Sequence, residues 1–183
     1  MAEYVIAVDA MGGDNAPIEI AKGCRMAVDQ MPDIRILIAG KPDAVEPLIA
    51  GAERIELLSA SEVIDPHEAP LIAIRRKADS SMVKCALAVK EARAQAMVSA
   101  GSTGAVLACG ILRIGRIAGI DRPALAPVLP GRKKPFLLID AGANVDCQPE
   151  YLRQFGLMGS VYMEKVLRVR EPRVCLANIG EEP

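Results

Sequence analysis

The chain has 183 residues, of which 51% are hydrophobic and 25% charged, which is enough apolar material for one domain with a sizeable core. Aromatic residues make up only 3% of the chain, there is no tryptophan, and the formal net charge is −1. A nucleic-acid surface needs basic charge and aromatic stacking platforms, so the composition excludes nucleic acid as a partner.

The five cysteines are an odd number, are widely spaced and include no C-x-x-C pair. Such thiols indicate a reduced, cytoplasmic protein rather than a disulfide framework or a zinc site. The N-terminus has Glu3 ahead of its first apolar run and lacks the basic region of a secretory signal. No apolar run reaches the roughly 20 residues of a membrane-spanning helix. We expect no metal site and no cofactor.

Strands and helices alternate through the first hundred residues. The runs predicted as strands are 4–8, 34–39, 54–58 and 96–98, and those predicted as helices are 18–31, 43–50, 71–77 and 80–95. Strands separated by helical segments indicate an α/β fold with a mainly parallel sheet, covered by helices on both faces.

The remaining chain continues this pattern. A helix is predicted over 105–114 and another over 151–166, and strands are predicted over 124–129, 136–139 and 174–177. We expect these strands to join the same sheet, so that residues 1–183 form a single α/β domain.

A glycine-rich turn follows the strand predicted over 96–98. Ser99, Gly101 and Gly104 allow a tight turn and a close approach of backbone N–H groups, and Ser102 or Thr103 can cap the next helix. This arrangement suits an anion, because a helix N-terminus supplies N–H donors and a positive dipole end. A single motif of this kind is more often a plain capped turn than an anion site, and both interpretations stay open.

Similar turns follow other predicted strands. Asp9, Gly12, Gly13, Asp14 and Asn15 follow the first strand. Two further turns, at Asp140–Asn144 with Gly142 at its centre and at Asn178–Gly180, follow the strands at 136–139 and 174–177. Loops after parallel strands emerge at one edge of the sheet, so we expect these residues to converge on a single crevice.

A second candidate for anion binding is the helix that starts at Ser80 and Ser81. Basic side chains lie nearby, with Lys77 just before this helix and Arg122 before a proline. Anion binding at the helix start and simple helix capping are both consistent with the two serines.

Several common activities lack their residues. The chain contains neither G-x-x-x-x-G-K-[ST] nor G-x-G-x-x-G, which removes the usual nucleotide fingerprints. Ser102 has Ala100 rather than glycine two residues before it, so it is not a nucleophile elbow. A catalytic triad would depend on the single histidine, His67, which we interpret as a structural or surface residue.

Five ordered blocks carry a resemblance to a known family. They are Ala7–Pro17, Ile74–Met82, Ser99–Ala105, Gly119–Ala124 and Asp140–Asn144. Together they resemble the bacterial phosphate acyltransferases of phospholipid synthesis, which move a fatty acyl group from acyl carrier protein to inorganic phosphate. The resemblance implies a three-layer α/β/α fold related to isopropylmalate dehydrogenases and phosphotransacetylases. It also implies homodimers and a cytoplasmic enzyme with peripheral association at the inner membrane surface.

The resemblance departs from the family pattern at the C-terminal end. Family chains continue beyond the Gly-Glu-Glu that matches Gly180, Glu181 and Glu182, and they carry a Lys-Gly-Asn block that this chain lacks. We therefore expect residues 1–183 to be a truncated form of a longer family chain. The dimer helices and the membrane-touching segment are expected in the part that is absent here.

The resemblance implies that inorganic phosphate is itself the nucleophile, so no activated serine or cysteine is required. We predict that Ser102, Thr103 and Gly104 bind phosphate and that Lys77 or Arg122 neutralises its charge. The predicted catalytic residues are Asp9, Asp14, Lys77 and Asn144, and the predicted substrate-binding residues are Gly12, Gly13, Asn15, Ser80, Ser81, Ser99, Gly101, Ser102, Thr103, Gly104, Arg122, Asp140 and Gly142.

The acidic acyl carrier protein needs a basic surface. We predict that it is steered by the cationic residues Arg113, Arg116, Arg132, Lys133 and Lys134, which are also consistent with ordinary solvated charges. Two other functions stay open: a short-chain phosphotransacetylase, and a non-catalytic half of a truncated or split enzyme.

Overall fold

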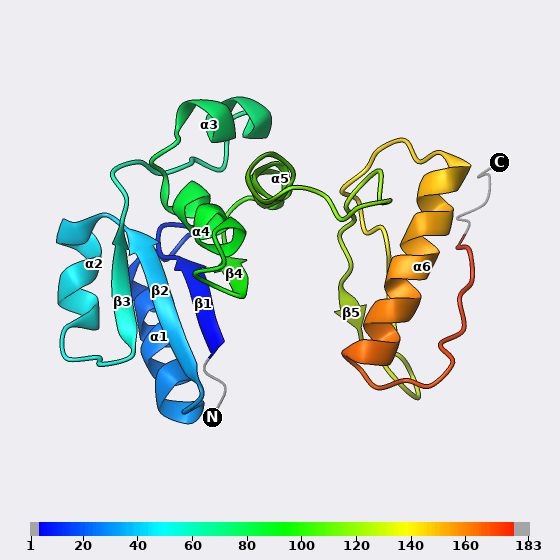
Figure 1. The fold of residues 1–183 in the computed structure, drawn as a ribbon, viewed down its shortest axis with the longest axis horizontal. Helices are drawn as coiled ribbons and strands as arrows, with labels where there is room; N and C mark the ends of the chain where they lie inside the picture. Colours follow the sequence, from blue (N-terminus) through cyan, green and yellow to red (C-terminus); the bar gives the residue numbers. More distant parts are fainter. Residues whose placement is uncertain (1–3, 178–183) are drawn as a thin grey trace. The chain divides into compact units, whose positions relative to one another are not determined.

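The computed structural model describes residues 4–177. These residues form two compact units, which meet in the sequence between Gly115 and Arg116 (Figure 1), and each unit is described by itself. The single domain expected over 1–183 stays a prediction. The predicted turn at Asn178–Gly180 lies outside the described residues.

The first unit contains the parallel sheet that the sequence predicts. Its strands β1 (Tyr4–Asp9), β2 (Ile34–Gly40), β3 (Ile55–Ser59) and β4 (Ala96–Ser99) lie in the order β3-β2-β1-β4, with every pair parallel. In this register Asp9 is paired with Ser99, so β1 and β4 end side by side.

Helices cover both faces of this sheet (Figure 1). Along β2, Ile38 packs with α1 (Ile18–Gln30) and α2 (Pro42–Ile49), whereas its neighbour Leu37 packs with α4 (Ser81–Lys90). Successive side chains of a strand point to opposite faces, and both faces here are apolar, as a buried parallel strand requires. The first unit is therefore a three-layer α/β/α arrangement.

A second cluster of buried residues extends this unit away from the sheet. It joins Ile74 of α3 (Pro70–Arg76) and Val83 of α4 to Ala105 and Cys109 of α5 (Thr103–Cys109). α5 continues as the π-helical turn η1 (Gly110–Ile114). The predicted helix over 105–114 is thus present but changes its hydrogen-bonding pattern partway.

The second unit differs from the prediction. Its strands β5 (Val128–Leu129) and β6 (Phe136–Leu137) are two residues long and antiparallel, and beside them lies one helix, α6 (Pro149–Lys165). The expectation that they join the parallel sheet is wrong, because prolines at 123, 127, 130 and 135 remove backbone donors and restrict strand length. The strand predicted over 174–177 is also wrong, since this segment is irregular and its Val174 and Leu176 are exposed.

No helix within residues 4–177 combines the length and the apolar character needed to cross a membrane.

Candidate functional site

The buried carboxylate of Asp9 joins the ends of β1 and β4. Asp9 is 2% exposed, and its Oδ1 accepts a hydrogen bond from the Met11 N–H at 3.1 Å. Its Oδ2 accepts one from the Ser99 hydroxyl at 2.7 Å, and the Ser99 oxygen accepts one from the Gly101 N–H at 3.1 Å. Both carboxylate oxygens therefore hold the two turns that follow these strands.

The glycines of the two turns are required by this close approach. A Cβ on Gly12 would lie 2.7 Å from Asp9 Oδ2, 2.8 Å from the Gly101 nitrogen and 2.9 Å from Ser99 Oγ. Gly13 has a φ of 99°, and its position is crowded by Ala100 as well. The backbones of the two turns thus touch where a side chain has no room.

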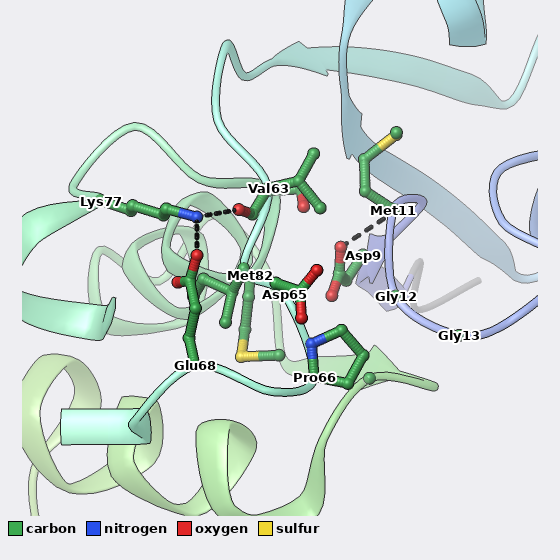
Figure 2. A pocket seen from close by; sticks show the side chains of 13 residues that line it. Asp9, Met11, Gly12, Gly13, Val63, Asp65, Pro66, Glu68, Lys77 and Met82 are labelled. Carbon is green, nitrogen blue, oxygen red and sulfur yellow. Dashed lines mark hydrogen bonds and ion pairs between the residues drawn. The ribbon is translucent and has the colours of Figure 1, made fainter. Parts of the chain in front are cut away.

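A pocket of about 300 Å³ opens beside these turns (Figure 2). Its polar lining consists of Asp9, Asp65, Glu68, Lys77 and Ser81. The remaining lining residues are glycines, hydrophobic residues and a proline, namely Met11, Gly12, Gly13, Val63, Ile64, Pro66, Met82 and Gly101. Six of the predicted site residues, Asp9, Gly12, Gly13, Lys77, Ser81 and Gly101, therefore line one pocket.

Lys77 fastens the loop between β3 and α3 to one wall of this pocket. Its Nζ donates a hydrogen bond to the Val63 carbonyl at 2.7 Å and forms an ion pair with Glu68 Oε1 (Figure 2). The other oxygen of Glu68 is buried and has no hydrogen-bond partner among residues 4–177. Lys77, the one lysine among the described residues that line the pocket, thus already has a carboxylate beside it.

A second set of contacts anchors the start of the same loop. Asp79 accepts hydrogen bonds from the Ser61 N–H at 2.9 Å and the Ser61 hydroxyl at 2.6 Å, and its other oxygen lies 2.6 Å from Lys84 Nζ. The hydrogen bond with Lys84, followed by those from Ser61, holds the pKa of Asp79 well below its usual range. Asp79 therefore stays ionised and keeps this end of the loop fixed.

The N-terminus of α4 faces the pocket. Ser81 and Met82, in its first turn, line the pocket, and the Ser81 residue is 2% exposed. Ser80, at the N-cap position, donates its hydroxyl to the Lys77 carbonyl at 2.9 Å, and no side chain caps this helix. The two predicted serines thus differ: Ser81 lies on the pocket, whereas Ser80 holds the preceding turn.

The other predicted residues of the first unit lie outside the pocket lining. Asp14 and Asn15 are exposed beyond Gly13. Ser102 occupies the N-cap position of α5 without a side-chain capping bond. Thr103 and Gly104 begin that helix, where a Cβ on Gly104 would lie 3.1 Å from Pro70 of α3.

The predicted residues of the second unit form a network of their own. Asp140 accepts hydrogen bonds from the Leu125 N–H and the Asn144 N–H, each at 2.7 Å. The Asn144 side chain donates to the Pro123 carbonyl at 2.9 Å, and Gly142 provides a positive φ of 100° in the same turn. This turn follows β6, which is not part of the parallel sheet, so the predicted convergence at one sheet edge does not apply to it.

The predicted basic residues are also engaged locally. The guanidinium of Arg122 lies 5.9 Å from the centroid of the Tyr151 ring. Arg113 donates to the Ile74 carbonyl at 2.6 Å, and Arg116 donates to the Asp121 carbonyl at 2.5 Å. Arg113 and Arg116 thus serve the fold of their own units, while Arg132, Lys133 and Lys134 are exposed.

Sequence reasoning missed the acidic wall of the pocket. Asp65 and Glu68 lie in the irregular segment around Pro66, between β3 and α3. Only the tertiary fold brings them into one pocket with Gly12 and Gly13. Their signal in the sequence was two carboxylates in a proline-bounded loop just before a basic run. Within residues 4–177, no three side chains of metal-binding type gather into a metal site.

The cysteines of the first unit are buried thiols. Burial raises the pKa of Cys24 and of Cys109 to about 11, and it raises that of Cys85 further. These thiols are neutral near pH 7 and do not act as nucleophiles.

The fold is that of the phosphotransacetylases. A solved phosphotransacetylase from Streptococcus pyogenes matches it with a TM-score of 0.66 and 17% identity, covering 91% of this chain and 55% of that one. The EutD phosphotransacetylase from Staphylococcus aureus matches with a TM-score of 0.62 and 17% identity, covering 87% and 53%. These similarities confirm the predicted three-layer α/β/α fold.

The family follows from the sequence comparison. The model of the family described as "Fatty acid synthesis protein" matches residues 4–183, so the chain belongs to this family. Proteins named phosphate acyltransferase from Clostridium botulinum and Heliobacterium modesticaldum are 54% and 53% identical to it over 182 residues, which is 97% of this chain. The chain spans about half the length of these relatives, 54% in both cases.

Proposed function

We propose that this chain supplies the phosphate-binding part of an enzyme that transfers a fatty acyl group from acyl carrier protein to inorganic phosphate. Membership of the fatty acid synthesis family and the similarity to proteins named phosphate acyltransferase support this proposal. The observation that carries it is the pocket whose walls are the Gly12–Gly13 turn, Gly101 and the first turn of α4.

Phosphate binds at the α4 end of this pocket. A helix N-terminus offers N–H donors and a positive dipole end, and α4 is ten residues long without a side-chain capping hydrogen bond. Its Ser81 N–H already donates to the Glu62 carbonyl at 3.3 Å, so we assign phosphate to the N–H groups that follow in the first turn. The buried Ser81 adds a hydroxyl donor at the same place. Glycines at 12, 13 and 101 keep the opposite wall free of side chains.

Lys77 is the cation that we assign to phosphate. It lines the pocket, and its ammonium is held by Glu68 and the Val63 carbonyl, so phosphate has to share this charge with the Glu68 carboxylate. Asp9 also lines the pocket, and its carboxylate accepts one hydrogen bond on each oxygen, from Met11 and from Ser99, so we assign it the role of positioning the two turns. Asp65, which is exposed, repels phosphate, so we assign phosphate to the part of the pocket beside Ser81.

The reaction needs no nucleophilic side chain. A phosphate oxygen attacks the thioester carbonyl, a C–O bond forms, and the negative charge moves to the carbonyl oxygen. Collapse of this intermediate breaks the C–S bond and releases the carrier thiolate, which takes up a proton. The protein lowers the barrier mainly by holding the phosphate oxygen in line with the thioester carbonyl carbon. Hydrogen-bond donors near the developing oxyanion lower it further.

The remaining predicted assignments belong to the same proposal. Ser102, Thr103 and Gly104 form an alternative phosphate site at the start of α5. Arg122, Asp140 and Gly142 keep their predicted role in substrate binding and Asn144 its predicted catalytic role, and the enzyme works as a cytoplasmic homodimer with peripheral association at the inner membrane surface.

A chimera tests the proposal, with this chain replacing the matching part of the Clostridium botulinum relative. We expect acyl phosphate to form from palmitoyl-acyl carrier protein and phosphate, and much more slowly from acetyl-coenzyme A. Formation from acetyl-coenzyme A alone would support a short-chain phosphotransacetylase, and no product with any donor would contradict both.

Substitution of Ser81 tests the phosphate site in the same chimera. Ser81→Ala removes a hydrogen bond to a charged ligand, so we expect a rise of about tenfold or more in the KM for phosphate. The double variant Ser102→Ala/Thr103→Ala is the matched comparison and is expected to change this KM less than twofold. A larger rise in the KM for phosphate in the Ser102→Ala/Thr103→Ala variant than in Ser81→Ala would assign the phosphate site to the start of α5 instead.

A further inference from the structure

The short helix α3 has two sharply different sides. Ala73 and Ile74 are 4% and 0% exposed, whereas Leu71 and Ile72 are 55% and 54% exposed, and Arg75 and Arg76 are exposed as well. At 3.6 residues per turn, the four exposed side chains occupy one continuous arc of about 140°. We call Leu71, Ile72, Arg75 and Arg76 the α3 patch.

The charges of the α3 patch are uncompensated. α3 contains no acidic residue, and neither Arg75 nor Arg76 forms an ion pair within the part of the chain that the structure describes. The patch thus places two adjacent cations beside two exposed branched apolar side chains. This combination is favourable against a partner that offers carboxylates and a small apolar surface.

The α3 patch is held rigidly. Ile74 anchors α3 in the second buried cluster, and Arg113 donates a hydrogen bond to the Ile74 carbonyl at 2.6 Å. Figure 1 shows α3 lying beyond α4, away from the sheet, where its outer side is clear of the first unit. A docking partner would therefore meet a helix whose backbone is fixed, and the ordering cost would fall on the exposed side chains of the patch.

The segments that precede and follow α3 in the sequence both line the pocket. The loop that ends at Pro70 contributes Val63–Pro66 and Glu68 to the pocket wall, and Lys77, directly after α3, lines the same pocket. α3 is therefore flanked on both sides by segments that line the proposed phosphate site.

We propose that the α3 patch docks the acidic carrier protein that delivers the acyl thioester, an inference that rests on the proposed function. The chain has a formal net charge of −1, so overall charge does not attract an acidic protein, and a local basic surface has to do so. Arg75 and Arg76 pair with carboxylates of an acidic helix, and Leu71 and Ile72 cover its apolar residues. Stable anchoring on lipid needs a larger apolar face than two side chains, which disfavours a membrane here.

The first test measures binding of fluorescently labelled acyl carrier protein to the chain by anisotropy at low salt. We expect Arg75→Glu/Arg76→Glu to weaken binding by about tenfold or more, because charge reversal replaces attraction by repulsion. The control Lys41→Glu/Lys90→Glu makes the same charge change at exposed lysines of the same unit and is expected to alter binding less than twofold. Circular dichroism checks that both variants fold.

Unchanged binding by the Arg75→Glu/Arg76→Glu variant would overturn the proposal, as would absence of binding by the unaltered chain. Equal weakening by the control would also overturn it, because the effect would then be one of overall charge. Loss of binding to phosphatidylglycerol vesicles, with carrier binding intact, would instead assign the patch to lipid.

Kinetics of the chimera separate this inference from the proposed function. We expect the arginine variant to raise the KM for palmitoyl-acyl carrier protein about tenfold while leaving the KM for palmitoyl-pantetheine and for phosphate unchanged. A chimera that makes no acyl phosphate from any donor contradicts the proposed function. The anisotropy result still decides whether α3 binds the carrier.

Discussion

The two compact units of the chain bury their hydrophobic residues to very different extents. Of the 26 buried hydrophobic residues within 4–177, 25 lie in the first unit and one, Phe155, lies in the second. The first unit has a parallel sheet with a core on each face, whereas the second has two short antiparallel strands beside α6. Rigidity at the pocket is therefore a property of the first unit, where regular strands fix the positions of its turns.

The polar networks of the two units differ in the same way. In the first unit, the Asp9–Ser99 contact joins residues 90 positions apart at the ends of paired strands. In the second, Asp140 and Asn144 hold residues within one local turn and the nearby segment at Pro123 and Leu125. Long-range contacts of the first kind can shape a pocket only when a core holds both strands in register.

Substitution of Phe155 should cause the largest change in the relative stability of the two units. Phe155→Ala deletes the one buried hydrophobic side chain of the second unit, and truncation of a buried phenylalanine costs about 3–5 kcal/mol. We expect amide hydrogen exchange in α6 to become fast while the first unit keeps its protection.

The matched variant Ile38→Ala removes a fully buried side chain from the first unit, at a cost of about 2–5 kcal/mol. We expect it to lower the protection of the whole parallel sheet without changing α6. Simultaneous loss of protection in both units after either substitution would show that they unfold as one.

Substitution of Gly12 should have a smaller effect, confined to the pocket. Gly12→Ala places a methyl group under 3 Å from Asp9, Ser99 and Gly101, and such overpacking costs about 1–3 kcal/mol. Urea denaturation followed by circular dichroism measures this change.

The control Gly23→Ala introduces the same methyl group in α1, where no atom lies within 4 Å. Because alanine is the better helix former, this variant is expected to stabilise the unit by about 0.5–1 kcal/mol. Equal effects of the two substitutions would contradict the close packing of the Gly12 turn.

The smallest expected effect is on the acid sensitivity of the two units, which should depend on a different carboxylate in each. Asp79 in the first unit and Glu150 in the second have lowered pKa values, that of Glu150 falling from 4.5 to about 2, mainly through its hydrogen bond with Arg153. A carboxylate with a lowered folded-state pKa stabilises the protein above its unfolded pKa, and this contribution is lost as the pH falls through the folded value.

We therefore expect Asp79→Asn to reduce the acid sensitivity of the first unit below about pH 4, and Glu150→Gln to reduce that of α6 between pH 4.5 and 2. Both groups are exposed, so the effects are small and decline with added salt. Amide hydrogen exchange, measured for each unit at several pH values, tests these two expectations. They would be contradicted if each substitution changed the acid sensitivity of the other unit.

The sequence predicted the first unit well because its strands are continuous apolar runs between clear turn signals. The runs at 34–39 and 96–98 differ by a single residue from β2 and β4, and the helix predicted over 18–31 is α1 within one residue. The prediction failed at 124–129, 136–139 and 174–177, where apolar composition suggested strands but prolines or the lack of a partner strand prevented them. Local composition cannot supply a pairing partner.

By itself, the sequence determined the parallel α/β fold, the family resemblance and the glycine turns after β1 and β4, since these depend on periodicity and on residues with unusual backbone freedom. The tertiary structure decided which predicted residues share the pocket. It joined Lys77 to Glu68, turned Ser80 away from the pocket and Ser81 toward it, and placed Asp65 opposite Gly12. Those outcomes depend on contacts between loops far apart in sequence, which strand register and core packing fix in space.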